Sequence, residues 1–194
     1  QLNILNYLYF YNGAGTAVAD FNNDGLLDIY FTGNQVSDKL YLNQGNFQFK
    51  DIIGNAGIDT SSTSWNTGVT TVDINADGLL DLYVCTVSGH LDLKGHNKLY
   101  INQGTTNGIP TFKEAASEYG LDFTGLSTQA SFFDYDKDGD LDMYLLNHSV
   151  HPNSNYGRAA IRKVPDNLRG DKLYRNDDGK FTEATQQAGI FSSK

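Results

Sequence analysis

Short runs of alternating apolar and polar residues, separated by turns rich in Gly, Asn and Asp, run through this chain. Runs such as Leu27–Thr32, Lys39–Asn43 and Phe47–Lys50 have the length and the alternation of β-strands, and turn residues bound them. The pattern therefore predicts an all-β protein built from short strands.

The same pattern occurs three times. Segments 17–30, 70–83 and 131–144 align with one another, and their lead aspartates Asp20, Asp73 and Asp134 are 53 and 61 residues apart. A Lys-Leu-Tyr-x-Asn block and then a Phe-x-acid block follow each segment in the same order. Each unit contains four expected strands, which suits a β-propeller blade better than the shorter rungs of a β-solenoid. We expect one propeller segment over residues 1–194, with blades at about 12–58, 65–121 and 127–190.

Closed propellers have about 4–8 blades, and three repeats fall short of that number. We therefore expect the chain to be part of a longer protein whose ring has about seven blades. The alternative is a small protein that closes its ring by oligomerisation. In either case, the remaining blades or partner subunits would cover strand edges and apolar blade faces that an open arc leaves exposed.

Composition narrows the class of protein. A formal net charge of −9 over 194 residues argues against a nucleic-acid partner, which requires basic surface. No apolar run approaches the roughly 18 residues of a membrane-spanning helix. The single cysteine, Cys85, lies in an apolar run and is expected to be a buried hydrophobic residue rather than a reactive thiol.

Each repeat contains one acidic loop with oxygen-bearing side chains at positions 1, 3, 5 and 9 and glycine at position 6. Oxygen ligands at this spacing converge when the loop wraps, and the glycine permits the tight bend. Calcium prefers six to eight hard oxygen ligands, whereas magnesium retains its waters, so calcium is the expected ion. An EF-hand is excluded because position 12 is apolar in every repeat. With the backbone carbonyl at position 7 included, the expected ligands of three calcium ions are Asp20, Asn22, Asp24, Leu26, Asp28, Asp73, Asn75, Asp77, Leu79, Asp81, Asp134, Asp136, Asp138, Asp140 and Asp142.

An ordinary turn rich in Asp, Asn and Gly is the alternative interpretation of any one such loop. Recurrence in all three repeats favours calcium. The loops account for ten ligand carboxylates, and three bound Ca²⁺ ions would change the formal charge from −9 to −3. Because clustered carboxylates repel one another without an ion, we expect calcium binding and folding to be coupled.

These motifs resemble the FG-GAP/VCBS repeat, the calcium-loop blade of integrin α-subunit propellers and of many bacterial surface proteins. The resemblance covers roughly residues 12–191, and the Lys-Leu-Tyr-x-Asn block is similar to the bacterial branch. It implies a secreted, cell-surface or outer-membrane-associated scaffold that recognises proteins or glycans. Some polysaccharide lyases share the repeat, so part of a polysaccharide-active enzyme and a purely architectural subunit are the alternatives.

All four histidines lie between the second and third expected strands of a repeat, which places them on the face opposite the acidic loops. Repeat three has an insertion at about 149–170 that contains three of the four arginines. A long, Arg-containing loop on a rigid scaffold is typical of a binding surface for carboxylates or glycans. Simple packing of the histidines, or a histidine-based catalytic or metal centre, are the alternatives; no catalytic set is evident. The candidate ligand-binding residues are His90, His148, His151, Tyr156, Arg158, Arg162 and Arg169.

Overall fold

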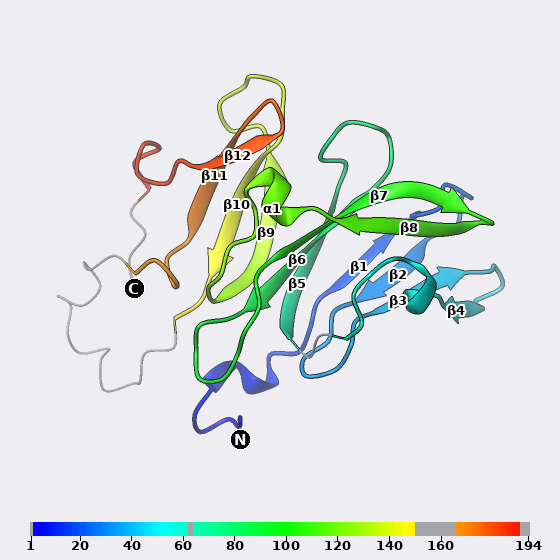
Figure 1. Cartoon of the computed structure of the whole chain (residues 1–194), viewed down its shortest axis with the longest axis horizontal. Helices are drawn as coiled ribbons and strands as arrows, with labels where there is room; N and C mark the ends of the chain where they lie inside the picture. The colour runs from blue at the N-terminus through cyan, green and yellow to red at the C-terminus, as the bar shows by residue number, and fades with distance from the viewer. Residues whose placement is uncertain (1, 62–63, 150–165, 191–194) are drawn as a thin grey trace.

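The computed structural model describes residues 2–61, 64–149 and 166–190 as three four-stranded antiparallel sheets in chain order (Figure 1). Sheet one contains β1 (Thr16–Ala19), β2 (Asp28–Phe31), β3 (Lys39–Asn43) and β4 (Phe49–Asp51). Sheet two contains β5 (Trp65–Val72), β6 (Asp81–Val87), β7 (Lys98–Thr106) and β8 (Ile109–Glu114). Sheet three contains β9 (Ser127–Phe133), β10 (Asp142–Asn147), β11 (Lys172–Asp177) and β12 (Lys180–Glu183). The prediction of an all-β segment with three four-stranded blades is confirmed.

The sheets fan out from their first strands, as propeller blades do. Each sheet pairs its strands in chain order, and β5 lies against both β1 and β9. The Gly15 amide donates a hydrogen bond to the Thr67 carbonyl at 2.7 Å, and the Thr67 hydroxyl donates to the Ser127 carbonyl at 2.8 Å. The inner strands of all three blades are therefore joined directly.

Glycine permits the close approach of these inner strands. A Cβ atom on Gly15 would lie 2.6 Å from the Thr67 carbonyl oxygen, and one on Gly68 would lie 2.2 Å from the Thr128 carbonyl oxygen. Because both contacts are with backbone, a larger residue would push neighbouring blades apart.

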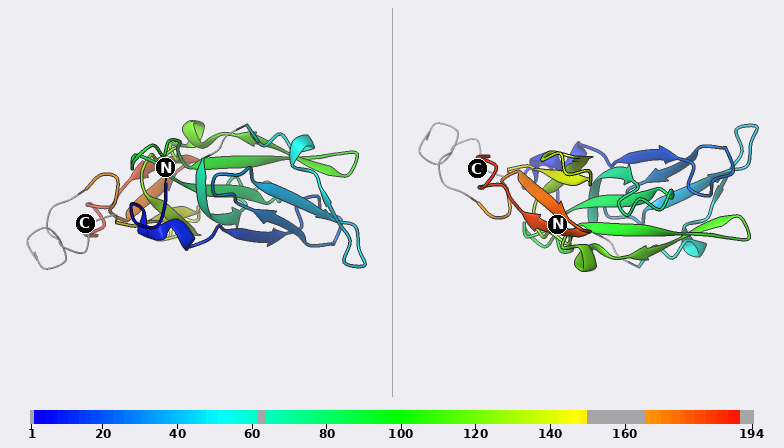
Figure 2. Two further views of the ribbon diagram at one scale, coloured as in Figure 1. Left: turned by 90° about the horizontal axis from the view of Figure 1, so that it is seen from below. Right: turned by 90° about the horizontal axis from the view of Figure 1, so that it is seen from above.

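Apolar cores lie between successive sheets, which are stacked face to face in Figure 2. Tyr30 and Leu40 of sheet one pack in the same buried cluster as Leu82 and Tyr100 of sheet two. A second cluster joins the opposite face of sheet two, including Cys85, to sheet three. Cys85 is buried, as expected, and burial raises the pKa of its thiol.

Three short helices complete the described elements. η2 (Ile53–Asn55) and α1 (Ala116–Tyr119) each follow the fourth strand of a blade. η1 (Leu8–Tyr11) precedes β1, and its flanking residue Tyr7 packs in a third cluster with Trp65. In the part of the chain that the structure describes, no helix combines the length and apolar character needed to cross a bilayer.

One strand differs from its expected position. We predicted the fourth strand of repeat one at Phe47–Lys50, but β4 spans Phe49–Asp51. Asn46 and Phe47 have φ angles of 52° and 58°, so both belong to the turn that follows Gly45. Phe47 is 98 % exposed there, and its aromatic character misled the assignment.

Candidate functional site

The three acidic loops connect the first two strands of each sheet, so all three lie at the same end of the inner strands. In each loop the lead aspartate closes the turn by accepting backbone hydrogen bonds. Asp20 accepts from the amides of Asp24 and Gly25 at 3.0 and 2.8 Å. Asp73 and Asp134 accept the corresponding bonds in their own loops at 2.9 to 3.2 Å. The three turns therefore share one hydrogen-bonding pattern.

Two positions of each loop adopt left-handed backbone conformations. Gly25, the glycine at position 6 of loop one, has φ of 87°, and the other two loops have the same feature. Position 4 also has positive φ, at 57° for Asn23, 57° for Ala76 and 67° for Lys137. This conformation disfavours residues with a Cβ atom, most clearly Ala and Lys, which lack the short polar side chain with which Asn can form a local hydrogen bond. Its occurrence in all three loops shows that the surrounding turn enforces it.

Loop three brings three carboxylates together. Asp134, Asp136 and Asp138 each place an oxygen atom within 4.8 Å of the others, and all three residues are exposed. The pKa of Asp136 lies above its usual range, first through desolvation and then through repulsion from the neighbouring aspartates. An arrangement of this kind offers hard oxygen ligands to a cation that would relieve the repulsion.

Loops one and two have asparagine at position 3 in place of the third exposed carboxylate. The Asn22 amide donates to the Asp24 carboxylate at 2.9 Å, and Asn75 donates to Asp77 at 2.8 Å. The amide reduces the repulsion within these loops while its own oxygen remains a hard ligand. The donor sets of all three loops therefore fit calcium.

The aspartate at position 9 is fully buried in every repeat: Asp28, Asp81 and Asp142. Each carboxylate accepts one N–H from position 2 of its loop and one from the third strand of its sheet. For Asp81 these donors are Ile74 at 3.0 Å and Asn102 at 2.8 Å. Burial is the main reason that the pKa of Asp81 is raised to about 6, and it also raises the pKa of Asp28. This aspartate therefore joins the loop to the sheet beneath it, whether or not it also holds an ion.

The opposite end of the blades contains His90 and His148, in the β6–β7 and β10–β11 connections. His148 is buried, and its Nε2 atom forms a 3.1 Å hydrogen bond with the Tyr7 hydroxyl. The His90 Nε2 atom lies 3.4 Å from the Asn6 carbonyl oxygen. The N-terminal segment thus packs on both histidines, a contact that sequence spacing did not reveal.

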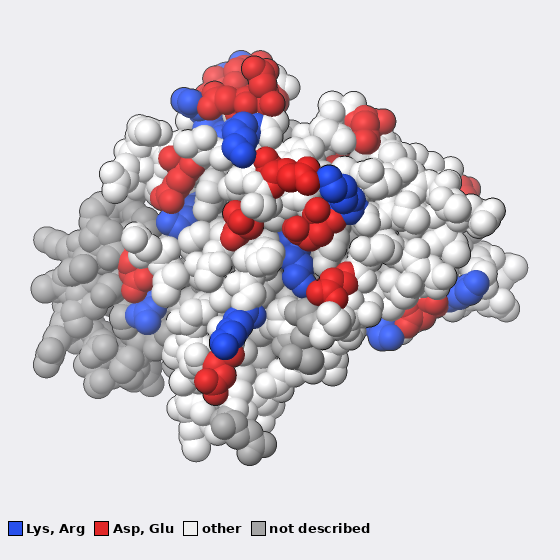
Figure 3. All heavy atoms as spheres, viewed as in Figure 1, with Lys and Arg blue, Asp and Glu red and all other residues white. Residues whose placement is uncertain are grey.

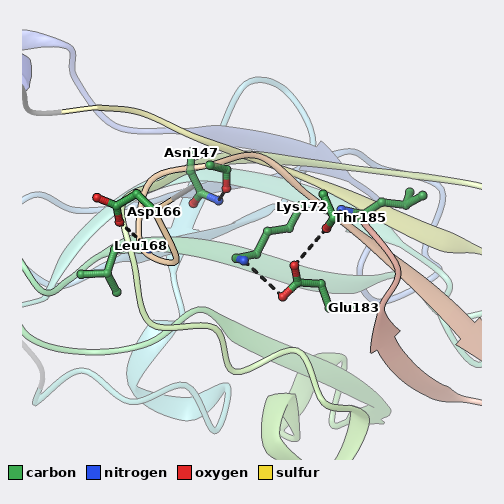
Figure 4. Close-up of polar contacts among 8 residues, drawn as sticks. Asn147, Asp166, Leu168, Lys172, Glu183 and Thr185 are labelled. Atoms are coloured by element: carbon green, nitrogen blue, oxygen red, sulfur yellow. Dashed lines mark hydrogen bonds and ion pairs between the residues drawn. The ribbon is translucent and has the colours of Figure 1, made fainter. Parts of the chain in front are cut away.

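Within the Arg-containing insertion, the structure describes residues 149 and 166–170. His151, Tyr156, Arg158 and Arg162 lie outside the described residues. Arg169 forms an ion pair with Asp166 at 3.4 Å. Asp166 also accepts a hydrogen bond from the Leu168 amide at 2.9 Å (Figure 4). The described end of the insertion is therefore a hydrogen-bonded turn.

Polar contacts also anchor the start of β11, next to this turn. Asn147 donates to the Gly170 carbonyl at 2.8 Å. Lys172 pairs with Glu183 at 3.1 Å, and Glu183 in turn accepts from the Thr185 hydroxyl at 3.1 Å (Figure 4). These contacts fix where the insertion rejoins the sheet.

Comparison with known proteins identifies the repeat. The FG-GAP-like repeat family matches residues 20–84, which run from the first acidic loop through the second. Over 137 residues the chain is also 30 % identical to cartilage acidic protein 1 of Homo sapiens, a match that covers 69 % of this chain and 20 % of that protein. The chain thus matches about a fifth of the length of this curated relative.

Figure 3 shows how charged side chains are distributed around the acidic loops. Acidic side chains gather over the β9–β10 loop at the top of the view, and another acidic group lies over the β5–β6 loop. Basic side chains lie beside the acidic group at the top and are also scattered among acidic ones lower on the same face. Acidic side chains therefore mark the exposed loop ends of sheets two and three, and others are spread over the rest of this face.

One set of polar residues in the three blades was not predicted from the sequence. The asparagine that ends each Lys-Leu-Tyr-x-Asn block bonds to the carbonyl at position 8 of its acidic loop. Asn102, for example, donates to the Leu80 carbonyl at 3.2 Å and accepts from the Gly104 amide at 2.9 Å. Recurrence of this asparagine in all three blocks was the available signal. The complete set is Asn43, Asn102 and Asn176.

Proposed function

We propose that this chain is a calcium-stabilised FG-GAP-type propeller segment that serves as a recognition scaffold outside the cell or at its surface. The observation that carries the proposal is the repetition of one acidic turn, with the same hydrogen bonds, at the same end of three adjacent inner strands. Extracellular calcium modules bind the ion with dissociation constants of about 10⁻⁴–10⁻³ M, which suits a structural role where calcium is abundant.

Each loop would hold one ion through the side chains at positions 1, 3, 5 and 9 and the carbonyl at position 7. The carbonyls concerned belong to Leu26, Leu79 and Asp140. The amides of the same residues donate to the carboxylates at position 5, at 2.8, 2.8 and 3.2 Å, so the turn already positions the residues that carry these carbonyls. Bound calcium would supply positive charge that offsets carboxylate repulsion. The chain itself supplies the turn that holds these carboxylates together.

A further blade is the proposed partner of the free face of sheet one. Phe31 and Phe49 are 40 % and 39 % exposed there. Their counterparts in sheet two, Val84 and Phe112, are 0 % and 5 % exposed because sheet one covers them. The free face of sheet one has apolar residues at the same positions as the covered face of sheet two. We therefore propose that another sheet of the same type covers it, from a longer chain or from a second copy.

The protein or glycan ligand is proposed to bind at the end opposite the acidic loops, where His90, His148 and Arg169 lie. Connections at this end differ most between repeats, since repeat three has the long insertion. Variable loops on a rigid scaffold are typical positions for recognition.

Thermal unfolding tests the calcium proposal. Asp77→Asn keeps a side-chain oxygen that can accept the Leu79 amide but removes one ligand charge, and Asp92→Asn, at an exposed acid of the opposite end, is the matched control. If the free calcium concentration is about 100 times Kd, each occupied site raises the free energy of unfolding by about 2.7 kcal/mol. We expect Asp77→Asn to lower the Tm in calcium by roughly 5–10 °C and to have little effect in chelator. A wild-type Tm that calcium leaves unchanged would contradict the proposal.

A further inference from the structure

A cavity of about 240 Å³ opens where the inner strands begin, at the end opposite the acidic loops. The N-terminal segment forms one wall, and the first residues of β5 and β9 form another. Three aromatic side chains, two threonines and a histidine line it: Tyr7, Tyr9, Trp65, Thr67, Thr128 and His148. Among the described residues, neither the acidic loops nor the Arg-containing insertion contributes to this lining.

The aromatic wall is held rigidly. The ring of Tyr7 meets that of Trp65 edge to face, with centroids 5.3 Å apart. The Tyr9 ring lies 4.1 Å from that of His148, centroid to centroid, and is partly exposed. Tyr7 and Trp65 are only 1 % and 3 % exposed, so Tyr9 offers the apolar surface to a ligand, and its packing limits the side-chain freedom lost on binding.

The polar groups of the cavity are neutral. Its lining among the described residues contains no Asp, Glu, Lys or Arg. His148 is held neutral at physiological pH, because burial lowers its pKa to about 4. A fixed charge on the ligand would therefore find no opposite charge here and would lose its hydration.

Hydrogen-bonding groups flank the aromatic wall. The hydroxyls of Thr67 and Thr128 donate to the carbonyls of Ser127 and Leu146 at 2.8 and 3.0 Å, which leaves their oxygens able to accept. The exposed Asn12 carboxamide lies at the rim. These groups suit a ligand that carries several hydroxyl donors around an apolar ring.

The volume limits the ligand to one ring. Pockets for drug-sized molecules measure about 300–1,000 Å³, and this cavity is smaller. A pyranose has a C–H face that can stack on an aromatic ring and a hydroxylated edge that can bond to threonine and asparagine. We propose that the cavity binds a single neutral sugar ring, such as the terminal residue of a glycan. This inference rests on the proposed recognition function and assigns it a ligand class and a position.

The chain provides its own probe, since Trp65 is its single tryptophan and lines the cavity. Tryptophan emission is measured in calcium buffer during titration with neutral methyl pyranosides, namely glucoside, galactoside, mannoside and fucoside. Choline and acetate serve as charged probes. We expect at least one neutral pyranoside to give a saturable change and both ions to give none. Saturation by choline alone, or by no sugar, would overturn the proposal.

Variants connect the signal to the cavity. Tyr9→Ala removes a ring of the wall and Asn12→Ala a rim amide, and each is expected to weaken sugar binding at least 5-fold. Tyr11→Ala is the control from the same segment, since this side chain is 78 % exposed and does not line the cavity. Unchanged affinity in both Tyr9→Ala and Asn12→Ala, or an equal loss of affinity in Tyr11→Ala, would contradict the assignment. Calcium-dependent melting, measured on the same samples, reports separately on the scaffold proposal.

Discussion

His148 is a buried base whose surroundings disfavour its charged form. The Tyr7 hydroxyl meets its Nε2 atom, the Tyr9 ring packs on its imidazole, and His90 would repel its positive charge. Desolvation is the largest reason that its pKa falls to about 4. The folded protein therefore binds a proton at this site less readily than the unfolded chain does.

The sign of the pH dependence follows from this shift. The contribution of neutral His148 to stability is complete above the unfolded pKa of about 6.5 and is lost as pH falls toward 4. We expect the free energy of unfolding to fall by about 2 kcal/mol between pH 7.5 and pH 5 through this group, as measured by urea unfolding in saturating calcium. His148→Gln should lack this increment, whereas His96→Gln, at an exposed site, should retain it. An equal loss in wild type and His148→Gln would refute the account.

At the residue scale, the proximity of the loop residues could be predicted from the sequence, because these residues are close together along the chain. Asp20, Asp24 and Gly25 lie within six positions of one another, and one turn brings them together. The bond between Tyr7 and His148 joins residues 141 positions apart, and nothing in either neighbourhood marks it. Long-range packing by the N-terminal segment decided which residues surround the histidines.

Among the elements, the third strand of each blade supports the acidic loop of its own sheet. Asn102 at this position is 1 % exposed and also donates to the Phe21 carbonyl of loop one at 2.9 Å, so it joins two blades. Asn43, its counterpart in sheet one, is half-buried and bonds only within its own blade in the described hydrogen bonds. Their burial and partners therefore differ although their sequence context is the same.

The two asparagines form a matched pair for mutation. Asn102→Ala leaves the carbonyls of Phe21 and Leu80 without this donor in a buried site, and we expect it to cost about 2–3 kcal/mol. Asn43→Ala, where water can replace the side chain, should cost about 1 kcal/mol. Urea unfolding in calcium measures both variants. A larger loss for Asn43→Ala than for Asn102→Ala would contradict the proposed bracing between blades.

Strand positions could be predicted wherever alternation and turn residues agreed. β3 spans Lys39–Asn43, as predicted, because the block ends at a turn formed by Gln44 and Gly45. β4 was misplaced because Phe47 has the character of a strand residue, whereas the backbone of the turn places it outside the ladder. Side-chain type alone could not show the positive φ of Asn46 and Phe47.

For the whole molecule, we expect the free face of sheet one to govern assembly. Phe31 lies on this face and is 40 % exposed, whereas Phe47 is 98 % exposed in the β3–β4 turn away from it. We expect the chain to associate in solution as concentration rises, with Phe31→Glu reducing the association and Phe47→Glu leaving it unchanged. Sedimentation velocity in calcium measures this. A monomer at every concentration, or equal effects of both variants, would count against blade docking.

The central claim is that each of the three acidic loops binds one calcium ion. Native mass spectrometry in calcium counts the ions directly on the intact chain. The account predicts three ions for the wild type, two for Asp77→Asn and none when Asp24→Asn, Asp77→Asn and Asp138→Asn are combined, whereas Asp92→Asn should retain three. A wild-type chain without calcium, or an ion count that these loop substitutions do not change, would contradict it.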